Sequence, residues 1–351
     1  MTVGNEFNAT IEVSAGDGVM ASDWQPIVEF IRANDHFLLM THIRPDADGL
    51  GSQLAVAEGL RAIGKHCRVV IGSPLPPRYR FLDPQHSQIE QYTHETADAF
   101  RNCRAIIVLD TGTWNQLGDF AEFMKSLNVP RAVIDHHRTQ EDLGGIRHVD
   151  VSAEATGRLA HELLMALGVK LTPTMAHHTF MALALDTGWF RQSNTTARTY
   201  ALAAELVEAG ANPAPLYEQL FECAPVARLR LVGVALERLQ TRYNGLVCFT
   251  EVYLADYTTV GAVPGDTEDL INYPRSVNGV EVALIFMEQP EGGTKISFRA
   301  RSRVDVSKIA EQFGGGGHRL ASGARDDRDL PTVCDDVLNA VAKELRELKL
   351  I

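Results

Sequence analysis

The sequence predicts an α/β fold, with a parallel-sheet domain followed by a smaller α/β domain that has its own sheet. The chain has 351 residues, and at roughly one domain per 150 residues this length indicates two domains. Short apolar runs alternate with helical patterns in the first half, which is typical of a parallel sheet covered on both faces. A second set of strand patterns begins near residue 243, where we expect the second domain to start.

Four segments are expected along the chain. Residues 1–21 are small and polar with no clear period, and we interpret them as a mobile leader. Residues 22–210 are expected to form the parallel-sheet domain, residues 211–242 a helical connector, and residues 243–351 the second domain. A cleft between two such domains is a common place for a substrate, so the active site is expected there.

Strand and helix patterns follow one another through the first domain. The strand patterns are HFLLMTH, CRVVIG, RAIIVLD and RAVIDHH, and the helical pattern GSQLAVAEGLRAIG follows the first of them. Two later helical patterns, EATGRLAHELLMALG and HHTFMALALD, are separated by Gly168 and Pro173, which are typical of a helix end and a helix start. Asn194 or Thr195 is expected to cap the next helix, ARTYALAAELVEAG.

The connector and the second domain come next. The connector combines APLYEQLFEC with the amphipathic helical pattern PVARLRLVGVALERLQ. Three strand patterns follow, GLVCFTEVYL, VEVALIFMEQ and TKISFRARSR, and after them a glycine cluster and a last helix, CDDVLNAVAKELRELK. This order predicts a second, smaller α/β unit.

Composition and charge narrow the function classes. With 45% hydrophobic and 22% charged residues, the chain is typical of a globular protein, and no apolar run approaches the roughly 20 residues that span a bilayer. The start lacks a basic stretch followed by an apolar one, so we expect a cytoplasmic protein. The net charge of −12 argues against binding long duplex nucleic acid, because that affinity depends on many Lys and Arg contacts. A nucleic-acid substrate is therefore expected to be short.

Aspartates and histidines gather where the apolar strand patterns end. One set follows HFLLMTH in a loop rich in Pro, Asp and Gly, others end RAIIVLD and RAVIDHH, and one more follows a later apolar run. Parallel sheets bind ligands at the carboxyl ends of their strands, so these residues are expected to converge in one crevice. They are His42, Asp46, Asp48, Asp110, Asp135, His136, His137 and Asp186.

So many carboxylates in one crevice indicate a metal centre, because they would repel one another unless a cation lay between them. Oxygen donors mixed with imidazoles suit manganese or a similar octahedral ion better than zinc. Two such ions about 3.5 to 4 Å apart form the clamp used for displacement at phosphorus. A single Asp after a strand is more often a turn or cap residue. The adjacent His177 and His178 lie on a helical pattern without nearby acids, and we interpret them as structural.

The motifs together resemble a known family. The triplet Asp135-His136-His137, with HIRPDADGLGS, VLDTG and ALDTGWFRQSNTT, resembles the DHH phosphoesterase family. The segment SFRARSRVDVSKIAEQFGGGGHRLASGA resembles the DHHA1 domain that accompanies it. The combination is similar to the subfamily of nano-RNases and pAp phosphatases (NrnA-type), and it covers nearly the whole chain after the leader. In this chain the triplet is followed by RTQED instead of the commoner small and Asn-containing run.

The resemblance implies roles for these residues. One metal ion would be held by His42, Asp46 and Asp110, and a second by Asp48, Asp110, His136 and Asp186, so that Asp110 bridges them. His137 would face the substrate and help to stabilise or protonate the leaving oxygen. Asp135 would orient a histidine by contacting its ring, without binding a metal ion itself. The cofactors are then two divalent ions, with Mn²⁺ preferred and Mg²⁺ or Co²⁺ as alternatives.

The second domain offers candidate phosphate contacts. Gly315, Gly316 and Gly317 with His318 follow a helical pattern, and such a run is either a flexible linker or a place where the backbone closely approaches a phosphate. Arg299 and Arg301 lie two apart on a strand pattern, so they are expected to share a face. Guanidinium groups suit phosphate oxygens, although arginines at such positions can also be solvated surface residues.

We therefore expect a hydrolase in which a hydroxide held between two ions attacks phosphorus, while His137 and groups of the second domain steady the phosphate. The resemblance implies 3′-phosphoadenosine 5′-phosphate (pAp) and RNA or DNA fragments of a few nucleotides as substrates. Hydrolysis of linear or cyclic dinucleotides, manganese-dependent hydrolysis of pyrophosphate, and nucleotide binding without catalysis are the alternatives. Long duplex nucleic acid and membranes are not expected partners, and a homodimer stays open.

Overall fold

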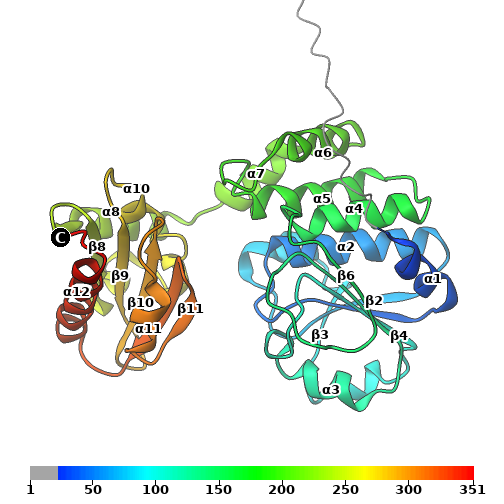
Figure 1. Cartoon of the computed structure of the whole chain (residues 1–351), viewed down its shortest axis with the longest axis horizontal. Helices are drawn as coiled ribbons and strands as arrows, with labels where there is room; N and C mark the ends of the chain where they lie inside the picture. The colour runs from blue at the N-terminus through cyan, green and yellow to red at the C-terminus, as the bar shows by residue number, and fades with distance from the viewer. Residues whose placement is uncertain (1–22) are drawn as a thin grey trace, which may run out of the picture. The chain divides into compact units, whose positions relative to one another are not determined.

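The computed structural model describes residues 23–351, which form two compact units (Figure 1). The first unit ends at Glu222 and the second begins at Cys223. The leader expected over residues 1–21 lies outside the described residues. The segment expected as a connector, residues 211–242, is divided between the units, with one of its helices on each side of the boundary.

The first unit is built on a six-stranded sheet in which every neighbouring pair of strands is parallel. The strands are β1 (Phe37–Met40), β2 (Cys67–Ile71), β3 (Ile89–Gln91), β4 (Ala105–Leu109), β5 (Arg131–Asp135) and β6 (Ile146–Val149), in the order β3-β2-β1-β4-β5-β6. The central β1 and β4 are apolar and wholly buried, which confirms the predicted α/β class. The edge strands β3 and β6 were not predicted, because IEQ and IRHV are short and polar.

Helices lie on both sides of this sheet. The helices of the first unit are α1 (Gln25–Ala33), α2 (Ala47–Ala62), α3 (Phe120–Ser126), α4 (Thr156–Ala166), α5 (Pro173–Asp186), α6 (Ala197–Glu208) and α7 (Pro213–Phe221), with short 3₁₀ helices η1 (Pro77–Leu82), η2 (Ala97–Phe100) and η3 (Asn115–Leu117). Of these, α6 packs on α5, on the side away from the sheet (Figure 1). On one face, Phe37 and Leu39 of β1 pack in a core with α1, α2, α4 and α5. On the other face, where Figure 1 shows α3, Leu38 and Met40 pack against α3, η2 and η3.

The start of α2 differs from the expectation. The helical pattern predicted a start at Gly51 and left Asp48 in a loop, but α2 begins at Ala47 and Asp48 lies in its first turn. The reason is an N-cap: the side chain of Asp46 accepts hydrogen bonds from the backbone N–H of Asp48, at 2.9 Å, and of Gly49, at 3.1 Å. The cap outweighs the low helix propensity of the glycines that follow it.

The cap of α6 was also predicted wrongly. Thr196, and not Asn194 or Thr195, caps the helix, since its side chain accepts a hydrogen bond from the backbone N–H of Thr199. The side-chain amide of Asn194 instead donates to the carbonyl oxygens of Glu154, at 3.1 Å, and Asp186, at 3.2 Å. Asn194 thereby fixes the end of α5, which carries one of the expected metal ligands.

Two glycines let α2 and α4 approach α5 closely. A Cβ on Gly51 of α2 would lie 2.5 Å from the carbonyl oxygen of His178, and a Cβ on Gly157 of α4 would lie 2.5 Å from the Cβ of Ala182. No other residue type fits at either position without a shift of the helices. His178 is buried in α5, and burial lowers its pKa to about 4, so its ring is neutral within the packed helices.

The second unit has a six-stranded sheet that is antiparallel except between β8 and β9. Its strands are β7 (Gln240–Arg242), β8 (Val247–Val252), β9 (Val282–Glu288), β10 (Thr294–Ala300), β11 (Gly316–His318) and β12 (Ala321–Asp326), in the order β11-β12-β10-β9-β8-β7. The helices are α8 (Val226–Glu237), α9 (Leu254–Val260), α10 (Asn272–Ser276), α11 (Val306–Glu311) and α12 (Leu330–Glu347), with a 3₁₀ helix η4 (Pro264–Thr267). The three predicted strands are β8, β9 and β10.

The glycine cluster and the last helix of this unit differ from what the sequence predicted. The glycine cluster forms an edge strand, β11, paired with β12. The last helix begins at Leu330, earlier than its predicted start at Cys334, because the side chain of Asp329 caps it by accepting from the N–H of Thr332 at 3.1 Å.

Within residues 23–351, none of the helices combines the length and the apolar character needed to span a bilayer.

Candidate metal centre

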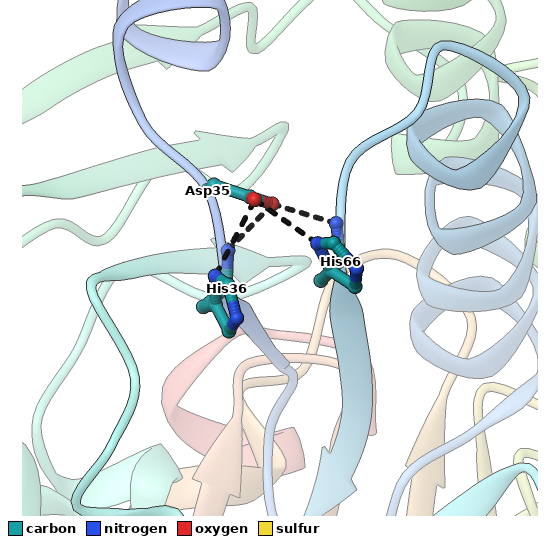
Figure 2. A group of neighbouring side chains, drawn as sticks. All are labelled: Asp35, His36 and His66. Carbon is teal, nitrogen blue, oxygen red and sulfur yellow. Dashed lines mark hydrogen bonds and ion pairs between the residues drawn. The ribbon is translucent and has the colours of Figure 1, made fainter.

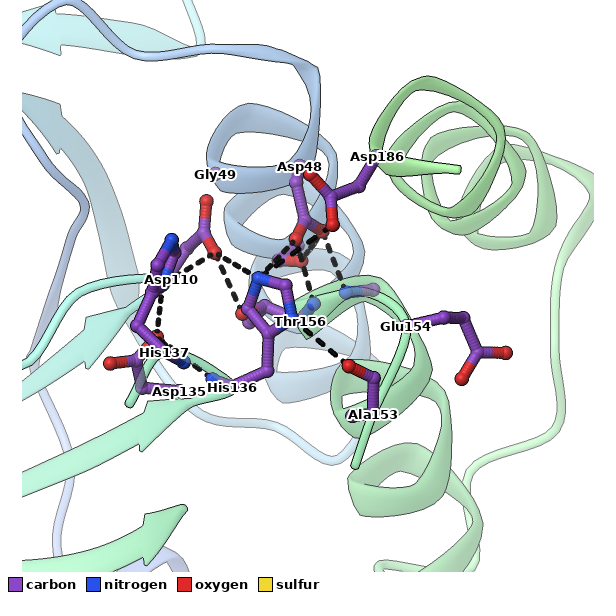
Figure 3. A network of polar contacts seen from close by, with 12 residues as sticks. Asp48, Gly49, Asp110, Asp135, His136, His137, Ala153, Glu154, Thr156 and Asp186 are labelled. Atoms are coloured by element: carbon purple, nitrogen blue, oxygen red, sulfur yellow. Dashed lines mark hydrogen bonds and ion pairs between the residues drawn. The ribbon is translucent and has the colours of Figure 1, made fainter. Parts of the chain in front are cut away.

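The residues expected as metal ligands meet where β1, β4 and β5 end, beside the start of α2 and the end of α5. Figure 3 shows four of them, Asp48, Asp110, His136 and Asp186. The expected ligands form groups whose donor atoms lie within 4.8 Å of one another. One group contains His42, Asp46 and Asp110, another contains Asp48, His136 and Asp186, and a third joins Asp110 and His136 to His137. The structure therefore brings together all six residues that were expected to hold metal.

His42 lies in the loop after β1 and turns its ring toward two carboxylates. Its Nδ1 lies 2.9 Å from the carbonyl oxygen of Ile43. Its Nε2 lies 3.5 Å from Oδ2 of Asp110 and 3.7 Å from Oδ1 of Asp46. Burial by itself lowers the pKa of His42, but the two carboxylates raise it to about 11. The carboxylates thus favour a positive centre at this position, and a metal ion can supply it while the imidazole stays neutral.

Asp110 directly follows β4 and is almost fully buried. Its two carboxylate oxygens face different histidines: Oδ2 lies 3.5 Å from Nε2 of His42, and Oδ1 lies 3.6 Å from Nε2 of His136. The hydroxyl of Thr156 donates a hydrogen bond to Oδ1 at 2.8 Å. One carboxylate is therefore shared between the two groups of donors.

The second group is built around His136, which follows β5. Its Nδ1 lies 3.1 Å from the carbonyl oxygen of Ala153, and its Nε2 lies 3.6 Å from Oδ2 of Asp48 and 3.8 Å from Oδ2 of Asp186. The buried carboxylate of Asp48 also accepts hydrogen bonds from two N–H groups at the start of α4, those of Thr156 at 2.7 Å and Gly157 at 2.8 Å. The N-terminus of α4 thus supports the negative charge of Asp48.

The carboxylates of this centre are strongly coupled. Burial and the neighbouring carboxylates of Asp110 and Asp186 raise the pKa of Asp48 well above its usual value. Burial and the charge of Asp110 also raise the pKa of Asp186, to about 6, although His136 opposes the rise. Without a cation, the carboxylates resist being ionised together.

The donor set fits divalent metal ions. Both His42 and His136 bind a backbone carbonyl through Nδ1 and present Nε2 to carboxylates, which is how metal-binding histidines are usually oriented. Their Nε2 atoms lie 3.5–3.8 Å from the carboxylate oxygens. Two ligands about 2.1 Å from one ion, at right angles, lie roughly 3 Å apart, so a small contraction suffices. The excess of oxygen donors suits manganese or magnesium.

His137 and Asp135 form a pair beside the donor groups. Oδ1 of the buried Asp135 lies 2.8 Å from Nδ1 of His137 and accepts hydrogen bonds from the backbone N–H of His136, at 2.8 Å, and of His137, at 3.2 Å. The hydrogen bond that Nδ1 of His137 donates to Asp135 is the main reason that the pKa of His137 rises to about 9. The His137 side chain is 51% exposed and can reach a ligand.

Two residues that bind the carboxylates of this site were not predicted from the sequence. Thr156 binds both Asp110 and Asp48, and only its place at the start of a helical pattern could have pointed to it. Gln140 donates a hydrogen bond from Nε2 to Oδ2 of Asp135 and accepts one from Arg147. Gln140 belongs to the RTQED run, so the unusual sequence after the triplet supplies a partner for Asp135.

A pocket of about 130 Å³ opens beside the donor groups. Its lining includes Asp46, Asp48 and Asp186 together with the ring of Tyr79, from η1. Tyr79 was not anticipated from the sequence, because η1 has no apolar period. The pocket gives a small ligand access to the donors.

The arginines expected to bind phosphate lie in different surroundings. Arg299 lies on β10 and lines a pocket of about 310 Å³ with Lys295 and Ser297. Arg301 lies just beyond the end of β10, and its guanidinium donates to the carbonyl oxygens of Val280, at 3.0 Å, and Arg275, at 3.1 Å. Arg301 therefore also holds the local backbone together.

The glycine cluster follows α11. A Cβ on Gly315 would lie 2.1 Å from the carbonyl oxygen of Gly323, and a Cβ on Gly317 would lie 2.7 Å from that of Ala321. These glycines therefore let this segment pack closely along β12. His318 ends β11 and is exposed.

Two family models match the chain. The model described as the DHH family, N-terminal domain, matches residues 36–185, and the DHHA1 domain model matches residues 251–347. A chain with this parallel sheet and this cluster of donors is a metal-dependent phosphoesterase, a hydrolase that acts on phosphate ester bonds. It belongs to the DHH family, which confirms the resemblance found in the sequence.

Relatives agree with this assignment, and a solved structure shares the fold. The chain is 32% identical over 313 residues to the bifunctional oligoribonuclease and PAP phosphatase NrnA of Thermus thermophilus, covering 88% of this chain and 89% of that protein. It is 27% identical over 330 residues to the protein of the same name from Bacillus subtilis, covering 88% and 98%. An exopolyphosphatase-related protein from Bacteroides fragilis shares the fold with a TM-score of 0.84, at 22% identity, over 92% of this chain and 95% of that one.

Proposed function

We propose that this phosphoesterase hydrolyses pAp and oligonucleotides of a few residues with two divalent ions, preferably Mn²⁺, held at the centre described above. The names of the two NrnA relatives support the choice of substrates. The observation that carries the two-ion proposal is Asp110, whose two oxygens face His42 and His136 separately. A carboxylate in that position can bridge two ions.

The side chains have separable roles in this proposal. The metal ions, when bound, polarise the phosphoryl oxygens and lower the pKa of water. His42 and His136, oriented by backbone carbonyls, and the carboxylates Asp46, Asp48 and Asp186 hold the ions. Asp135 fixes Nδ1 of His137, so Nε2 is the atom that can donate a proton to the leaving oxygen.

The second unit is proposed to bind substrate phosphate through Arg299, Arg301 and His318, with the backbone of Gly315 to Gly317 close by. Arg299 supports this best, because it lies with Lys295 in a pocket lined by residues of β10 and η4. The chain has a net charge of −12, and the proposed phosphate contacts include only a few cationic side chains. Few phosphates can therefore be neutralised at once. Short substrates are therefore favoured over long ones.

A substrate panel tests the proposal. The purified protein with Mn²⁺ is assayed against pAp, a dinucleotide, a longer oligonucleotide and inorganic pyrophosphate. We expect turnover of pAp and the dinucleotide, slower turnover of the longer chain with a shallow salt dependence, and none of pyrophosphate. Preference for pyrophosphate, turnover of dinucleotides alone, or binding of nucleotides without hydrolysis would each replace the proposal with the corresponding alternative.

Asp110→Asn is the matched variant for this panel. Removing a group that supports a metal ligand commonly reduces activity roughly 10- to 100-fold. Removing the shared carboxylate itself is therefore expected to reduce turnover of every substrate by more than about 100-fold. Circular dichroism should show that the fold is retained. Near-normal turnover of the variant with Mn²⁺ would contradict the shared role of Asp110.

A further inference from the structure

A second group of possible metal ligands lies at the amino-terminal ends of strands in the first sheet, opposite the ends that carry the catalytic donors. Asp35 and His36 precede β1, and His66 precedes β2, whereas the catalytic donors lie beyond the ends of β1, β4 and β5 (Figure 2). At roughly 3.3 Å per residue, the length of β1 alone separates the two groups by about 13 Å. This group therefore has no part in the catalytic centre.

The two carboxylate oxygens of Asp35 contact different groups: Oδ1 contacts backbone N–H groups, and Oδ2 lies near two imidazoles. Oδ1 accepts hydrogen bonds from the backbone N–H of His36, at 2.8 Å, and of His66, at 2.7 Å, and so joins the starts of β1 and β2. Oδ2 lies 3.0 Å from Nδ1 of His66 and 3.4 Å from Nδ1 of His36. Joining the strands requires only Oδ1. Oδ2 and Nδ1 of His66 share a hydrogen bond at 3.0 Å, and a metal ion bound to both atoms would replace the proton of that hydrogen bond.

The two imidazoles are arranged as a pair. Their ring centroids are 4.8 Å apart with an interplanar angle of 25°, and Figure 2 shows both rings on the same side of the Asp35 carboxylate. His36 has a φ of 53°, a left-handed backbone conformation that histidine adopts more readily than most residues. The His36 and His66 side chains are 46% and 72% exposed, so a solvated ion can reach them.

The three donor atoms lie within 4.8 Å of one another, and the two separations that involve the carboxylate oxygen match those around one metal ion. Ligands at about 2.0–2.1 Å from a tetrahedral Zn²⁺ lie roughly 3.3 Å from one another. The observed separations of 3.0 and 3.4 Å between Oδ2 and the two Nδ1 atoms lie on either side of that value. We propose that Asp35, His36 and His66 bind one divalent transition-metal cation of the Zn²⁺ type at a peripheral site, with water completing its coordination.

The donor types separate this peripheral site from the catalytic one. Two imidazoles and one carboxylate suit Zn²⁺, Cu²⁺ or Ni²⁺, whereas the oxygen-rich catalytic cluster suits Mn²⁺ or Mg²⁺. An ion bound here joins the segments before β1 and β2 only in the folded chain. Its effect is therefore on stability, which rises with the concentration of Zn²⁺.

Calorimetric titration of Zn²⁺ into the full-length protein, in the presence of excess Mg²⁺, tests the proposal. We expect the unaltered protein to bind one more Zn²⁺ than His36→Ala or His66→Ala, or to bind it at least roughly tenfold more tightly. Hydrolysis with Mn²⁺ should be the same in all of these proteins. Equal Zn²⁺ binding by the unaltered protein and both variants would overturn the proposal.

His94→Ala is the matched control. His94 is also an exposed histidine beside a carboxylate, with Nε2 3.6 Å from Oδ2 of Asp119. No metal-binding group of the described residues includes it, so this variant should bind Zn²⁺ like the unaltered protein. A crystal of the unaltered protein grown with Zn²⁺ gives a test without mutation. Anomalous density at the zinc edge beside the two Nδ1 atoms supports the site, and its absence there overturns it.

Discussion

Asp110 is held in a backbone conformation that few side chains adopt. Its φ of 64° lies in the left-handed region, which costs a non-glycine residue on the order of 1 kcal/mol. The surroundings maintain it: its N–H donates to the carbonyl oxygen of Ile134 at 3.0 Å, and Thr156 binds its carboxylate. Such strain concentrates at functional sites, and here it accompanies a carboxylate that faces two histidines.

Thr156→Val tests the support of Asp110. The change keeps the shape of the side chain but removes the hydroxyl that donates to Oδ1 of Asp110 at 2.8 Å. Loss of such a contact to a metal ligand is expected to reduce Mn²⁺ affinity or turnover of pAp roughly 10- to 100-fold. Thr156→Ser keeps the hydroxyl and should stay close to the unaltered protein. If the Val variant matched the Ser variant in both measurements, this contact would not matter.

Glu281→Gln tests a buried carboxylate of the second unit. Burial by itself raises the pKa of Glu281, but N–H groups of Arg303, Val304 and Ser302 donate to its carboxylate and hold the pKa below the usual 4.5. The ionised Glu281 therefore stabilises the folded protein fully above about pH 4.5, the usual pKa of a glutamate. This contribution is lost as the pH falls through the lower pKa that Glu281 has in the folded protein. Replacing this acceptor should reduce the free energy of unfolding at pH 7 by about 1 to 3 kcal/mol.

Urea unfolding of the full chain at pH 7 and at acidic pH measures this effect. The difference between Glu281→Gln and the unaltered protein should shrink as the pH falls below 4.5. Glu291→Gln is the control, since Glu291 is 59% exposed and should change little. Equal stability of Glu281→Gln and the unaltered protein at pH 7 would contradict the role of these hydrogen bonds.

The clustering of the proposed metal ligands could be predicted at the residue level, because each follows an apolar strand or apolar run directly or after a short loop. The role of Thr156 could not be predicted, because its partners Asp110 and Asp48 lie 46 and 108 positions earlier in the sequence. No local period marks such a contact. Arg301 shows a related limit, since its spacing from Arg299 did not reveal that its donors bind backbone carbonyls.

At the scale of elements, the packing of α2 against α5 positions the site. Gly51→Ala should destabilise the protein by about 1 to 3 kcal/mol, because its Cβ would meet the carbonyl oxygen of His178 at 2.5 Å. Turnover should also fall, because α2 carries Asp48 and α5 carries Asp186. Thermal unfolding and assays of pAp hydrolysis measure both.

Gly233→Ala is the matched control for this change. Gly233 lies in α8, and a Cβ there meets nothing within 4 Å. The change should leave turnover unaltered and stabilise the helix by roughly 0.5 to 1 kcal/mol. If both variants gained stability, α2 and α5 would not require the close approach at Gly51.

The elements that sequence predicted well are those with a strong pattern. The buried strands β1 and β4 are continuous apolar runs, and the predicted α12 is amphipathic. The starts of α2 and α12 were predicted too late, because single Asp caps outside the periodic pattern set them. The edge strand β11 is made of GGH, whose pairing with β12 depends on contacts that no local preference encodes.

For the whole molecule, the sequence indicated two sheets because strand patterns occur in two sets. Each unit has its own hydrophobic core on both faces of its sheet. All the proposed metal ligands belong to the first unit, and the proposed phosphate anchors belong to the second. Kinetic effects of the two sets should therefore differ in kind.

Arg299→Ala and His318→Ala test the contribution of the second unit. A hydrogen bond to phosphate is worth roughly 1.5 to 3 kcal/mol, so kcat/KM for pAp should fall roughly tenfold to a hundredfold, mainly through KM. Bound manganese should not change. Arg328→Ala is the control, because its guanidinium pairs with Asp326 and Asp336. Lost manganese with unchanged KM would show that these residues serve the metal centre instead.

Electron paramagnetic resonance of bound Mn²⁺ tests most directly whether Asp110 joins two metal ions in one site, as proposed. Two ions about 3.5 to 4 Å apart under one carboxylate couple magnetically. The unaltered protein is predicted to bind two Mn²⁺ at this site with a coupled spectrum. Asp110→Asn is predicted to bind Mn²⁺ more weakly and to give the spectrum of isolated ions. A single bound ion in the unaltered protein, or an unchanged coupled spectrum in the variant, would contradict this proposal.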